Sequence, residues 1–273
     1  MLSQLKLAVK KQFAKLRFRL SAANNPLFIG FYRYFYSPKP GSLSEFLNAY
    51  SLARKGDFYV VQIGANDGIS NDPIHKFIKR DGWSGVLLEP QPFVYNTFLQ
   101  HIYRRNSGIH TLCAAIGEQD GTRELYQIGF SRMRWATGLA TFDRPSLERA
   151  FKNGFIASRC EKYGVEMPDS PEEQIIAEVV EVISPETLLK RYELPRIDLL
   201  QIDTEGFDYQ VIRMFDVAST QPQAIVYEHI HLLKADAAAC EELLATNGYR
   251  LRHFGANTLA LSKSVEGFEQ FLG

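Results

Sequence analysis

A turn rich in glycine and polar residues follows an apolar run in the segment 60–74, VVQIGANDGISNDPI. Gly64 and Gly68 let the backbone turn tightly and let a ligand approach it closely. If the apolar run is a strand of a parallel sheet, the turn lies at its carboxyl end, where such sheets bind ligands. The turn is therefore predicted to bind a ligand, and the alternative is an ordinary polar loop.

The spacing of the glycines and two carboxylates indicate the kind of ligand. The glycines follow G-x-x-x-G and not the G-x-G-x-x-G spacing that clasps the pyrophosphate of a dinucleotide. Glu89 ends the next apolar run, 22 residues after Asp67, and an ionised carboxylate there can accept both hydroxyls of a ribose. Two negative charges near the ligand suit a cationic adenosyl sulfonium better than a diphosphate.

A second group of acids and imidazoles follows two later apolar runs. Its members are Asp203 and Glu205 in QIDTEGFDYQVI, and Glu228, His229 and His231 in VYEHIHL. A carboxylate or an imidazole can take the proton that an alcohol loses during displacement chemistry, and imidazole titrates near about pH 6.5. Alternatively, Asp203 and Glu228 could hold a hard cation such as Mg²⁺, or the histidines could be structural. Strand alternation would place Glu228 and His229 on opposite faces.

Four segments, in this order, resemble the FkbM-type S-adenosylmethionine-dependent methyltransferase family: VVQIGANDG, GVLLEPQP, CAAIGEQDGTREL and IDLLQIDTEGFDYQVI. The resemblance covers about residues 56–262, apart from an insertion. It implies a class I methyltransferase (Rossmann-like) α/β fold with a seven-stranded, mostly parallel sheet whose last strand is antiparallel. It also implies methyl transfer, usually to a hydroxyl of a sugar, a lipid or a natural product.

The same resemblance implies the residues that bind the cofactor, S-adenosyl-L-methionine. They are Gly64, Asn66, Asp67 and Gly68 at its amino-acid end, Glu89 at its ribose, and Ala115 and Ile116 beside its adenine. Catechol O-methyltransferase holds a metal with Asp, Asp and Asn, whereas here a Glu–His pair stands where Asp–Asn would be. A divalent cation is therefore the less favoured alternative. Without it, Asp203, Glu205, His229 and His231 remain as the candidate catalytic groups.

The elements that position these residues alternate along the chain. Strands are predicted at 58–63, 85–89, 110–116, 197–202, 224–228, 249–254 and 258–262, and helices near 72–80, 91–104, 185–192, 206–216 and 234–246. This alternation predicts a parallel sheet covered by helices on both faces. Three residues separate the last two strands, which is too short for a crossover, so the final strand should be antiparallel.

The chain is predicted to divide into a basic amphipathic N-terminal helical appendage, residues 1–42, and a methyltransferase domain, residues 43–273. The break between them is SPKPGS at 37–42. An insertion at about 118–183 interrupts the alternation. It should contain a strand at GTRELYQI, a helix interrupted at Gly154 and a strand at IAEVVEVI. We expect it to lie over the sheet, where it could select the substrate.

The appendage combines an apolar stripe with positive charge. The stripe within the helix predicted at 2–20 is Leu2, Leu5, Val9, Phe13, Leu16 and Leu20. Residues 1–44 hold eight Lys or Arg and no Asp or Glu, and six aromatic residues follow the helix in the ten residues 27–36. This pattern predicts peripheral membrane contact through residues 1–40. Alternatively, the stripe docks on the domain or pairs with a second chain to form a homo-oligomer.

Composition sets the remaining expectations. The formal net charge is zero, and no nucleic-acid partner is expected. Three distant cysteines without a C-x-x-C pair favour a reducing, cytoplasmic location, and no secretory leader or spanning segment is expected. The expected partner is a small-molecule or glycan acceptor. The two rival functions are an NAD-dependent oxidoreductase and a non-catalytic binding module that keeps the fold.

Overall fold

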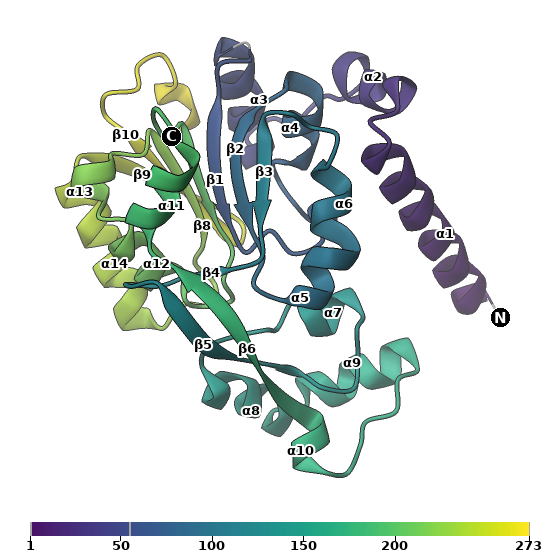
Figure 1. Cartoon of the computed structure of the whole chain (residues 1–273). Coiled ribbons are helices and arrows are strands. Elements are labelled where there is room, and N and C mark those ends of the chain that lie inside the picture. Colours follow the sequence, from purple (N-terminus) through teal and green to yellow (C-terminus); the bar gives the residue numbers. More distant parts are fainter. Residues whose placement is uncertain (1, 55, 273) are drawn as a thin grey trace.

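The centre of the molecule is a seven-stranded sheet (Figure 1). Its strands are β1 (Tyr59–Ile63), β2 (Ser84–Leu88), β3 (Ile109–Leu112), β7 (Leu199–Ile202), β8 (Ala224–Glu228), β9 (Tyr249–Phe254) and β10 (Asn257–Ser262). The computed structural model describes residues 2–54 and 56–272. The strand order is β3-β2-β1-β7-β8-β10-β9, and β10 runs antiparallel to both of its neighbours. The predicted mostly parallel sheet with an antiparallel last strand is confirmed.

Helices cover both faces of this sheet. One face carries α3 (Leu43–Arg54), α4 (His75–Asp81) and the consecutive segments α5 (Pro92–Val94), η1 (Tyr95–Leu99) and α6 (Gln100–Tyr103); the other carries α11 (Pro185–Tyr192), α12 (Asp208–Met214), α13 (Val217–Thr220) and α14 (Lys234–Thr246). Alternate strand residues point to opposite faces, so Val60 packs with the first set and Val61 with the second. A short helix, η2 (Glu269–Phe271), ends the described chain.

The run at 110–116, predicted as one strand, is divided between two sheets. β3 belongs to the main sheet, whereas β4 (Ala115–Ile116) joins a second sheet with β5 (Gly121–Ile128) and β6 (Ile175–Ile183). Ala115 and Ile116 pair in parallel with the end of β6. The single-strand prediction was wrong because the insertion offers β4 a backbone partner of its own.

The two strands predicted inside the insertion are confirmed as β5 and β6, which pair antiparallel. The predicted interruption is also present, since Gly154 adopts a φ of 79° between two helices. The insertion's helices are α7 (Arg134–Thr137), α8 (Arg144–Lys152), α9 (Phe155–Tyr163) and α10 (Pro171–Gln174), around a small apolar cluster of their own. Figure 1 shows them at the end of the main sheet where its parallel strands finish.

Two helices, α1 (Leu2–Ala22) and α2 (Pro26–Tyr34), precede α3 along the chain. The last turns of α1 dock on the domain. Phe18 packs edge-on against Phe98 of η1, with ring centroids 5.7 Å apart, and Ser21 Oγ lies 3.0 Å from Nε2 of His75. The first turns extend away from the domain (Figure 1). The side chains of residues 2–8, 10 and 11 lie outside the described part, so the predicted stripe is described from Val9 onward.

The helices that the structure describes include none long and apolar enough to cross a bilayer.

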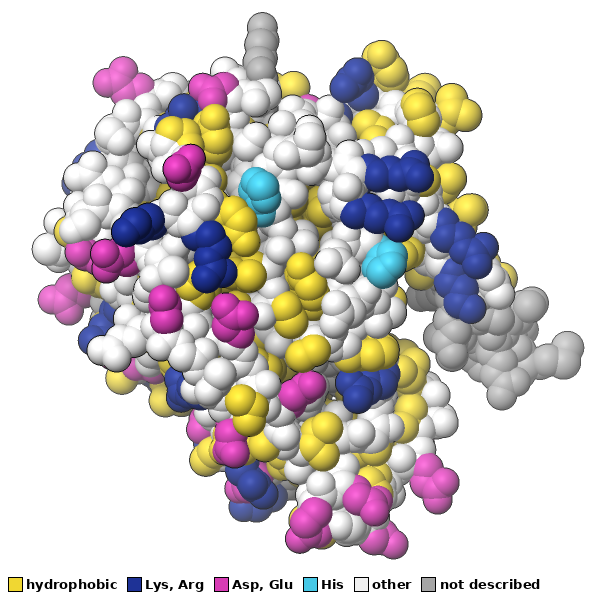
Figure 2. Space-filling view, viewed as in Figure 1, with side chains coloured by type: hydrophobic (Ala, Val, Ile, Leu, Met, Phe, Trp, Pro, Cys, Tyr) yellow, Lys and Arg dark blue, Asp and Glu magenta, His cyan; other side chains and the backbone are white. Residues whose placement is uncertain are grey.

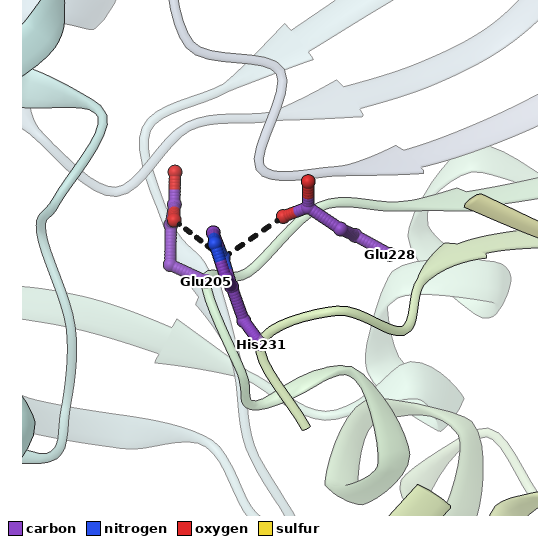
Figure 3. A group of neighbouring side chains, drawn as sticks. All are labelled: Glu205, Glu228 and His231. Carbon is purple, nitrogen blue, oxygen red and sulfur yellow. Dashed lines mark ion pairs between the residues drawn. The ribbon is translucent and has the colours of Figure 1, made fainter. Parts of the chain in front are cut away.

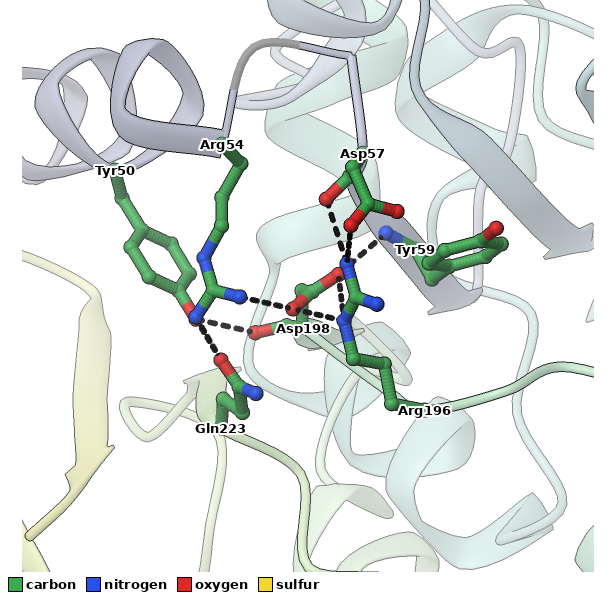
Figure 4. A network of polar contacts seen from close by, with 7 residues as sticks. All are labelled: Tyr50, Arg54, Asp57, Tyr59, Arg196, Asp198 and Gln223. Atoms are coloured by element: carbon green, nitrogen blue, oxygen red, sulfur yellow. Dashed lines mark hydrogen bonds and ion pairs between the residues drawn. The ribbon is translucent and has the colours of Figure 1, made fainter. Parts of the chain in front are cut away.

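A buried polar network joins α3 to the amino ends of β1 and β7 (Figure 4). Its centre is Asp198, whose side chain is fully buried. Asp198 pairs with Arg54 at 3.2 Å and with Arg196 at 2.9 Å, and it accepts a hydrogen bond from the backbone N–H of Tyr59 at 2.7 Å. Asp57, which is exposed, pairs with Arg196 from the solvent side. This network fixes the end of the sheet opposite the candidate site.

Candidate active site

A cavity lies at the carboxyl ends of β1, β2 and β7, between the main sheet and the insertion. The main domain contributes Gly64, Asn66, Glu89, Gln91, Asp203, Glu205 and Phe207 to the wall, and the chain from β4 to the segment after α7 contributes Ala115, Ile116, Leu125, Arg134, Thr137, Thr141 and Phe142. The location is where open α/β sheets bind ligands.

Gly64 begins the turn after β1 and cannot be replaced without strain. Its φ is 80°, and an added Cβ would lie 1.9 Å from the carbonyl oxygen of Asp203. The glycine therefore permits the ends of β1 and β7 to approach each other at the floor of the cavity.

The rest of the turn divides between the cavity wall and its support. Asn66 lines the cavity. The carboxylate of Asp67 accepts the backbone N–H groups of Ile69 and Ser70 at 3.0 and 2.7 Å, and Gly68 packs against the helical segment behind the turn. Asp67 and Gly68 are not among the lining residues, so both shape the turn.

Glu89 is buried beside the turn, and its carboxylate already accepts three hydrogen bonds from the protein. Its Oε2 accepts the backbone N–H of Asn66 at 2.8 Å, and its Oε1 accepts both the backbone N–H and the Nε2 of Gln91 at 3.0 Å. Burial raises the pKa of Glu89 to about 7. A carboxylate has about four lone-pair positions, so one remains for a ligand hydroxyl, whereas the sequence argument expected two.

Gln91, which sequence reasoning missed, also lines the cavity. Its side chain is buried, and its Nε2 donates to Glu89 and to the carbonyl oxygen of Thr137 at 2.9 Å. Its Oε1 has no hydrogen-bond partner among the described residues. Gln91 follows Glu89 in the segment GVLLEPQP, but only the tertiary contacts reveal that its amide oxygen is free.

Ala115 and Ile116 give the cavity an apolar wall. They reach it because β4 leaves the main sheet and pairs with β6. Leu125 of β5 and Val211 of α12 line the same space. The apolar surface suits a flat heterocycle.

Asp203 follows β7 and lines the cavity. Its carboxylate accepts no hydrogen bond from the residues that the structure describes. Burial, and then the negative charges of Glu228 and Glu205, raise the pKa of Asp203 to about 8. A group that titrates near neutral pH is well matched to accept a proton.

Glu205 and Glu228 converge on His231 (Figure 3). Nδ1 of His231 lies 2.9 Å from Oε2 of Glu205 and 3.1 Å from Oε2 of Glu228. These hydrogen bonds raise the pKa of His231 to about 10, so the imidazole is protonated at neutral pH and donates to the two carboxylates. Glu205 lines the cavity, whereas Glu228 and His231 are not among its lining residues.

Asp208, at the start of α12, holds this cluster in place and was also missed from the sequence. It is fully buried, and it accepts the backbone N–H of Thr204 at 3.2 Å, the Thr204 hydroxyl at 2.8 Å and the backbone N–H of Glu228 at 3.0 Å. The turn after β7 is thereby fastened to the end of β8. An aspartate at a helix start is the one signal that the sequence offers.

His229 lies away from the cavity. Its Nδ1 is 2.9 Å from the hydroxyl of Thr258 on β10, and its ring centroid is 4.7 Å from that of His253. The structure therefore does not bring His229 together with Asp203.

A metal ion would find its ligands in the cluster of Figure 3. Glu205, Glu228 and His231 each offer one ligand atom, and these atoms lie within 4.8 Å of one another. Asp203, which the sequence argument paired with Glu228 as a metal ligand, is not part of this set. A ligating imidazole must be neutral, so a cation would compete with the proton on His231.

The sequence matches the model of the methyltransferase FkbM domain over residues 62–251. Among solved structures, methyltransferase FkbM from Methylobacillus flagellatus KT is similar with a TM-score of 0.44 and 14% identity, over 75% of this chain and 43% of that protein's length. The delta-N METTL16 MTase domain is similar with a TM-score of 0.38 and 12% identity, over 90% of this chain and 98% of that domain. No curated protein matches the sequence.

Proposed function

Because the chain belongs to the FkbM methyltransferase family, we propose that it transfers a methyl group from S-adenosylmethionine to a hydroxyl oxygen. The acceptor would be a small molecule, a saccharide or a lipid-linked compound. The observation that carries the cofactor assignment is the pair of free acceptor positions on Glu89 and Gln91. Two adjacent ribose hydroxyls would satisfy both positions, including a buried amide oxygen that otherwise remains unpaired at a cost in free energy.

The other cavity residues suit the remaining parts of this cofactor. Gly64 and Asn66 leave room beside the backbone for its amino-acid end, and Ala115 and Ile116 provide an apolar wall for its adenine. Bound S-adenosylmethionine supplies a methyl group on a positively charged sulfur. The carboxylate of Glu205, which also lines the cavity, would favour that charge by Coulomb attraction in a partly buried site.

Asp203 would act as the general base. The acceptor oxygen loses its proton as it gains the methyl group, and the carboxylate of Asp203 is unpaired and titrates near neutral pH. Protonated His231 would keep Glu205 and Glu228 paired, so that neither competes with Asp203 for the proton. In a metal-dependent alternative, a cation would replace that proton, and activity would then be lost on chelation and restored by added Mg²⁺ or Mn²⁺.

Calorimetric titration tests the cofactor assignment against the rival functions. The full chain should bind S-adenosylmethionine and its demethylated product, and it should not bind NAD. Binding of NAD alone would favour an oxidoreductase. Cofactor binding without turnover of any hydroxyl-bearing acceptor would favour a non-catalytic module.

We propose a second role for α1 and α2, contact with an anionic lipid surface. Hydrophobic side chains stand out from these helices. On α2, Leu27, Tyr34 and the following Phe35 are 87%, 75% and 73% exposed, and on α1 Val9, Phe13 and Leu16 form an exposed stripe. Figure 2 shows hydrophobic side chains and Lys or Arg side chains gathered on this side of the molecule. Rings at headgroup level with cations nearby are typical of an interfacial helix.

The positive charge of this surface favours anionic lipid over a second copy of the chain as its binding partner. Residues 1–44 carry eight cationic side chains and no acidic one, which complements anionic lipid and disfavours a second copy of the same surface. Helix α1 is also fastened beside the glycine turn, because Arg17 donates to the carbonyl oxygen of Ile69, the residue after Gly68, at 3.3 Å. Lipid contact would thus hold the active site beside a lipid-linked acceptor.

A further inference from the structure

Arg134, the first residue of α7, lines the cavity and is not used by the chemistry proposed above. Its Nε atom is buried and has no hydrogen-bond partner in the part of the chain that the structure describes. The guanidinium lowers the pKa of both Glu89 and Asp203, which places its charge near each of them. A buried donor without a partner is costly, so a ligand group that accepts hydrogen bonds would stabilise this position.

The charge of the cavity indicates what that group is. The acidic lining residues are Glu89, Asp203 and Glu205, and Arg134 is the one Lys or Arg among the described residues that line the cavity. S-adenosylmethionine brings two positive groups, its sulfonium and its ammonium, and one negative group, its carboxylate. The acids suit the first two, and a guanidinium suits the third because its N–H groups match a carboxylate in pairs.

The position of α7 agrees with this assignment. The carbonyl oxygen of Thr137, one turn beyond Arg134, accepts hydrogen bonds from Gln91 Nε2 at 2.9 Å and from Asn66 Nδ2 at 3.5 Å. The helix is therefore fastened over the glycine turn, where the cofactor's amino-acid end is expected. An added Cβ at Gly138 would lie 2.2 Å from Nη1 of Arg134, so the guanidinium packs against the end of its own helix and is held in place.

We propose that Arg134 binds the carboxylate of the cofactor's amino-acid end. The inference rests on the proposed function and assigns to the insertion a part in cofactor binding as well as in acceptor selection. The cofactor would then bridge the two parts of the protein, with its ribose at the residues that follow β2 and its carboxylate at α7. The affinity for an analogue without the carboxylate should not depend on Arg134.

The test compares S-adenosylmethionine with its decarboxylated analogue by calorimetry. Both ligands keep the sulfonium and the amine, and they differ in the carboxylate. The full chain should bind S-adenosylmethionine about ten- to one-hundred-fold more tightly. Arg134→Met should lose that preference by weakening S-adenosylmethionine binding alone, and Arg134→Lys should keep part of it. Arg132→Met is the matched control, since Arg132 is exposed on the same segment and stacks on Phe93.

Each outcome decides the matter. Equal affinities of the unmodified protein for the two ligands, or a preference that survives in a folded Arg134→Met protein, would overturn the assignment while leaving the proposed function standing. Failure of the unmodified protein to bind either ligand would overturn both. The comparison within the unmodified protein does not depend on whether any variant folds.

Discussion

Asp203 and His231 lie in one acidic environment, which raises the pKa of both groups but gives them opposite roles. Burial and neighbouring carboxylates keep the proton on Asp203 up to a pKa of about 8, so the group can exchange a proton near neutral pH. The hydrogen bonds from His231 to Glu205 and Glu228 raise the pKa of the imidazole to about 10, so it stays charged. The pH dependence of the reaction should therefore follow Asp203.

We expect kcat/KM to rise with pH and to level off above an apparent pKa near 8, because Asp203 must be deprotonated to accept a proton. Asp203→Asn should lower kcat by about 10²–10⁴-fold and change the affinity for S-adenosylmethionine by much less. His229→Gln should retain activity, since His229 bonds to Thr258 away from the cavity. A variant that loses only cofactor affinity would move Asp203 into the cofactor-binding set.

Glu89→Ala should weaken S-adenosylmethionine binding by about ten-fold or more, because a ribose hydroxyl loses a charged acceptor. The same change also leaves the N–H groups of Asn66 and Gln91 unpaired, so the thermal midpoint of the free protein should fall. Calorimetry on the folded variant checks the first effect, and thermal unfolding checks the second. Unchanged affinity in a folded variant would remove Glu89 from the ribose site.

Sequence patterns were enough to recognise the site residues that the local backbone itself requires, such as a glycine in a tight turn. Gly64 could be assigned to the cavity because it begins a tight turn directly after a predicted strand, and Glu89 because it is an acid at the end of the next predicted strand. Gln91 and Arg134 could not be distinguished from other polar residues, because their unpaired atoms are defined by which groups surround them in three dimensions. For the same reason His229 and His231 looked alike in VYEHIHL, although they face different neighbours.

At the scale of elements, the apolar faces of α1 and α2 predict binding to vesicles that contain anionic lipid. Binding should weaken with added salt, since the attraction is screened over about 8–10 Å. Replacing Phe31 and Phe35 by Ser should abolish sedimentation with vesicles. Val179→Ser is the control, because Val179 lies on β6 and its exposed fraction, 66%, falls between those of Phe31, 55%, and Phe35, 73%.

Two results would contradict the lipid proposal. The protein could stay in the supernatant with anionic vesicles at low salt. Alternatively, sedimentation analysis could show a dimer that the Phe31 and Phe35 substitutions dissociate, and the surface would then serve a second copy of the chain.

The network around Asp198 predicts a large effect on stability at the other end of the sheet. Asp198→Ala removes a buried carboxylate from Arg54, Arg196 and the backbone of Tyr59, and it should lower the free energy of unfolding by about 3 kcal/mol. Asp57→Ala removes an exposed partner of Arg196 and should cost less than about 1 kcal/mol. Denaturant titrations measure the free energy of unfolding of both variants. Equal losses would show that the buried position of Asp198 does not increase its contribution to stability.

The division of residues 110–116 between β3 and β4 is a feature of the fold that the sequence could not predict. The apolar run fitted a single strand, and nothing local marks the point where it leaves the main sheet. The partner that draws β4 away is the end of β6, where Val182 and Ile183 pair with Ala115 and Ile116 although they are distant in sequence. The helix–strand alternation of the main domain was predictable because each of its elements carries its own periodicity.

At the scale of the whole molecule, the order of the elements determines where the cavity forms. Parallel strands bring their carboxyl ends to one edge, so Gly64, Glu89 and Asp203 meet there although they are far apart in sequence. The insertion covers that edge and supplies the wall opposite the sheet. Its arrangement over the cavity depends on contacts such as the one from Gln91 to Thr137, which no local pattern encodes.

The proposed reaction of the whole molecule is methyl transfer from S-adenosylmethionine to a hydroxyl in this cavity. Its most direct test is mass spectrometry of hydroxyl-bearing acceptors incubated with the full chain and S-adenosylmethionine labelled in the methyl group. We expect an acceptor to gain one labelled methyl group on oxygen with the unmodified protein, and to gain it far more slowly with Asp203→Asn. Label that reached only nitrogen or sulfur, or a product formed by Asp203→Asn at the unmodified rate, would show that the proposed reaction is wrong.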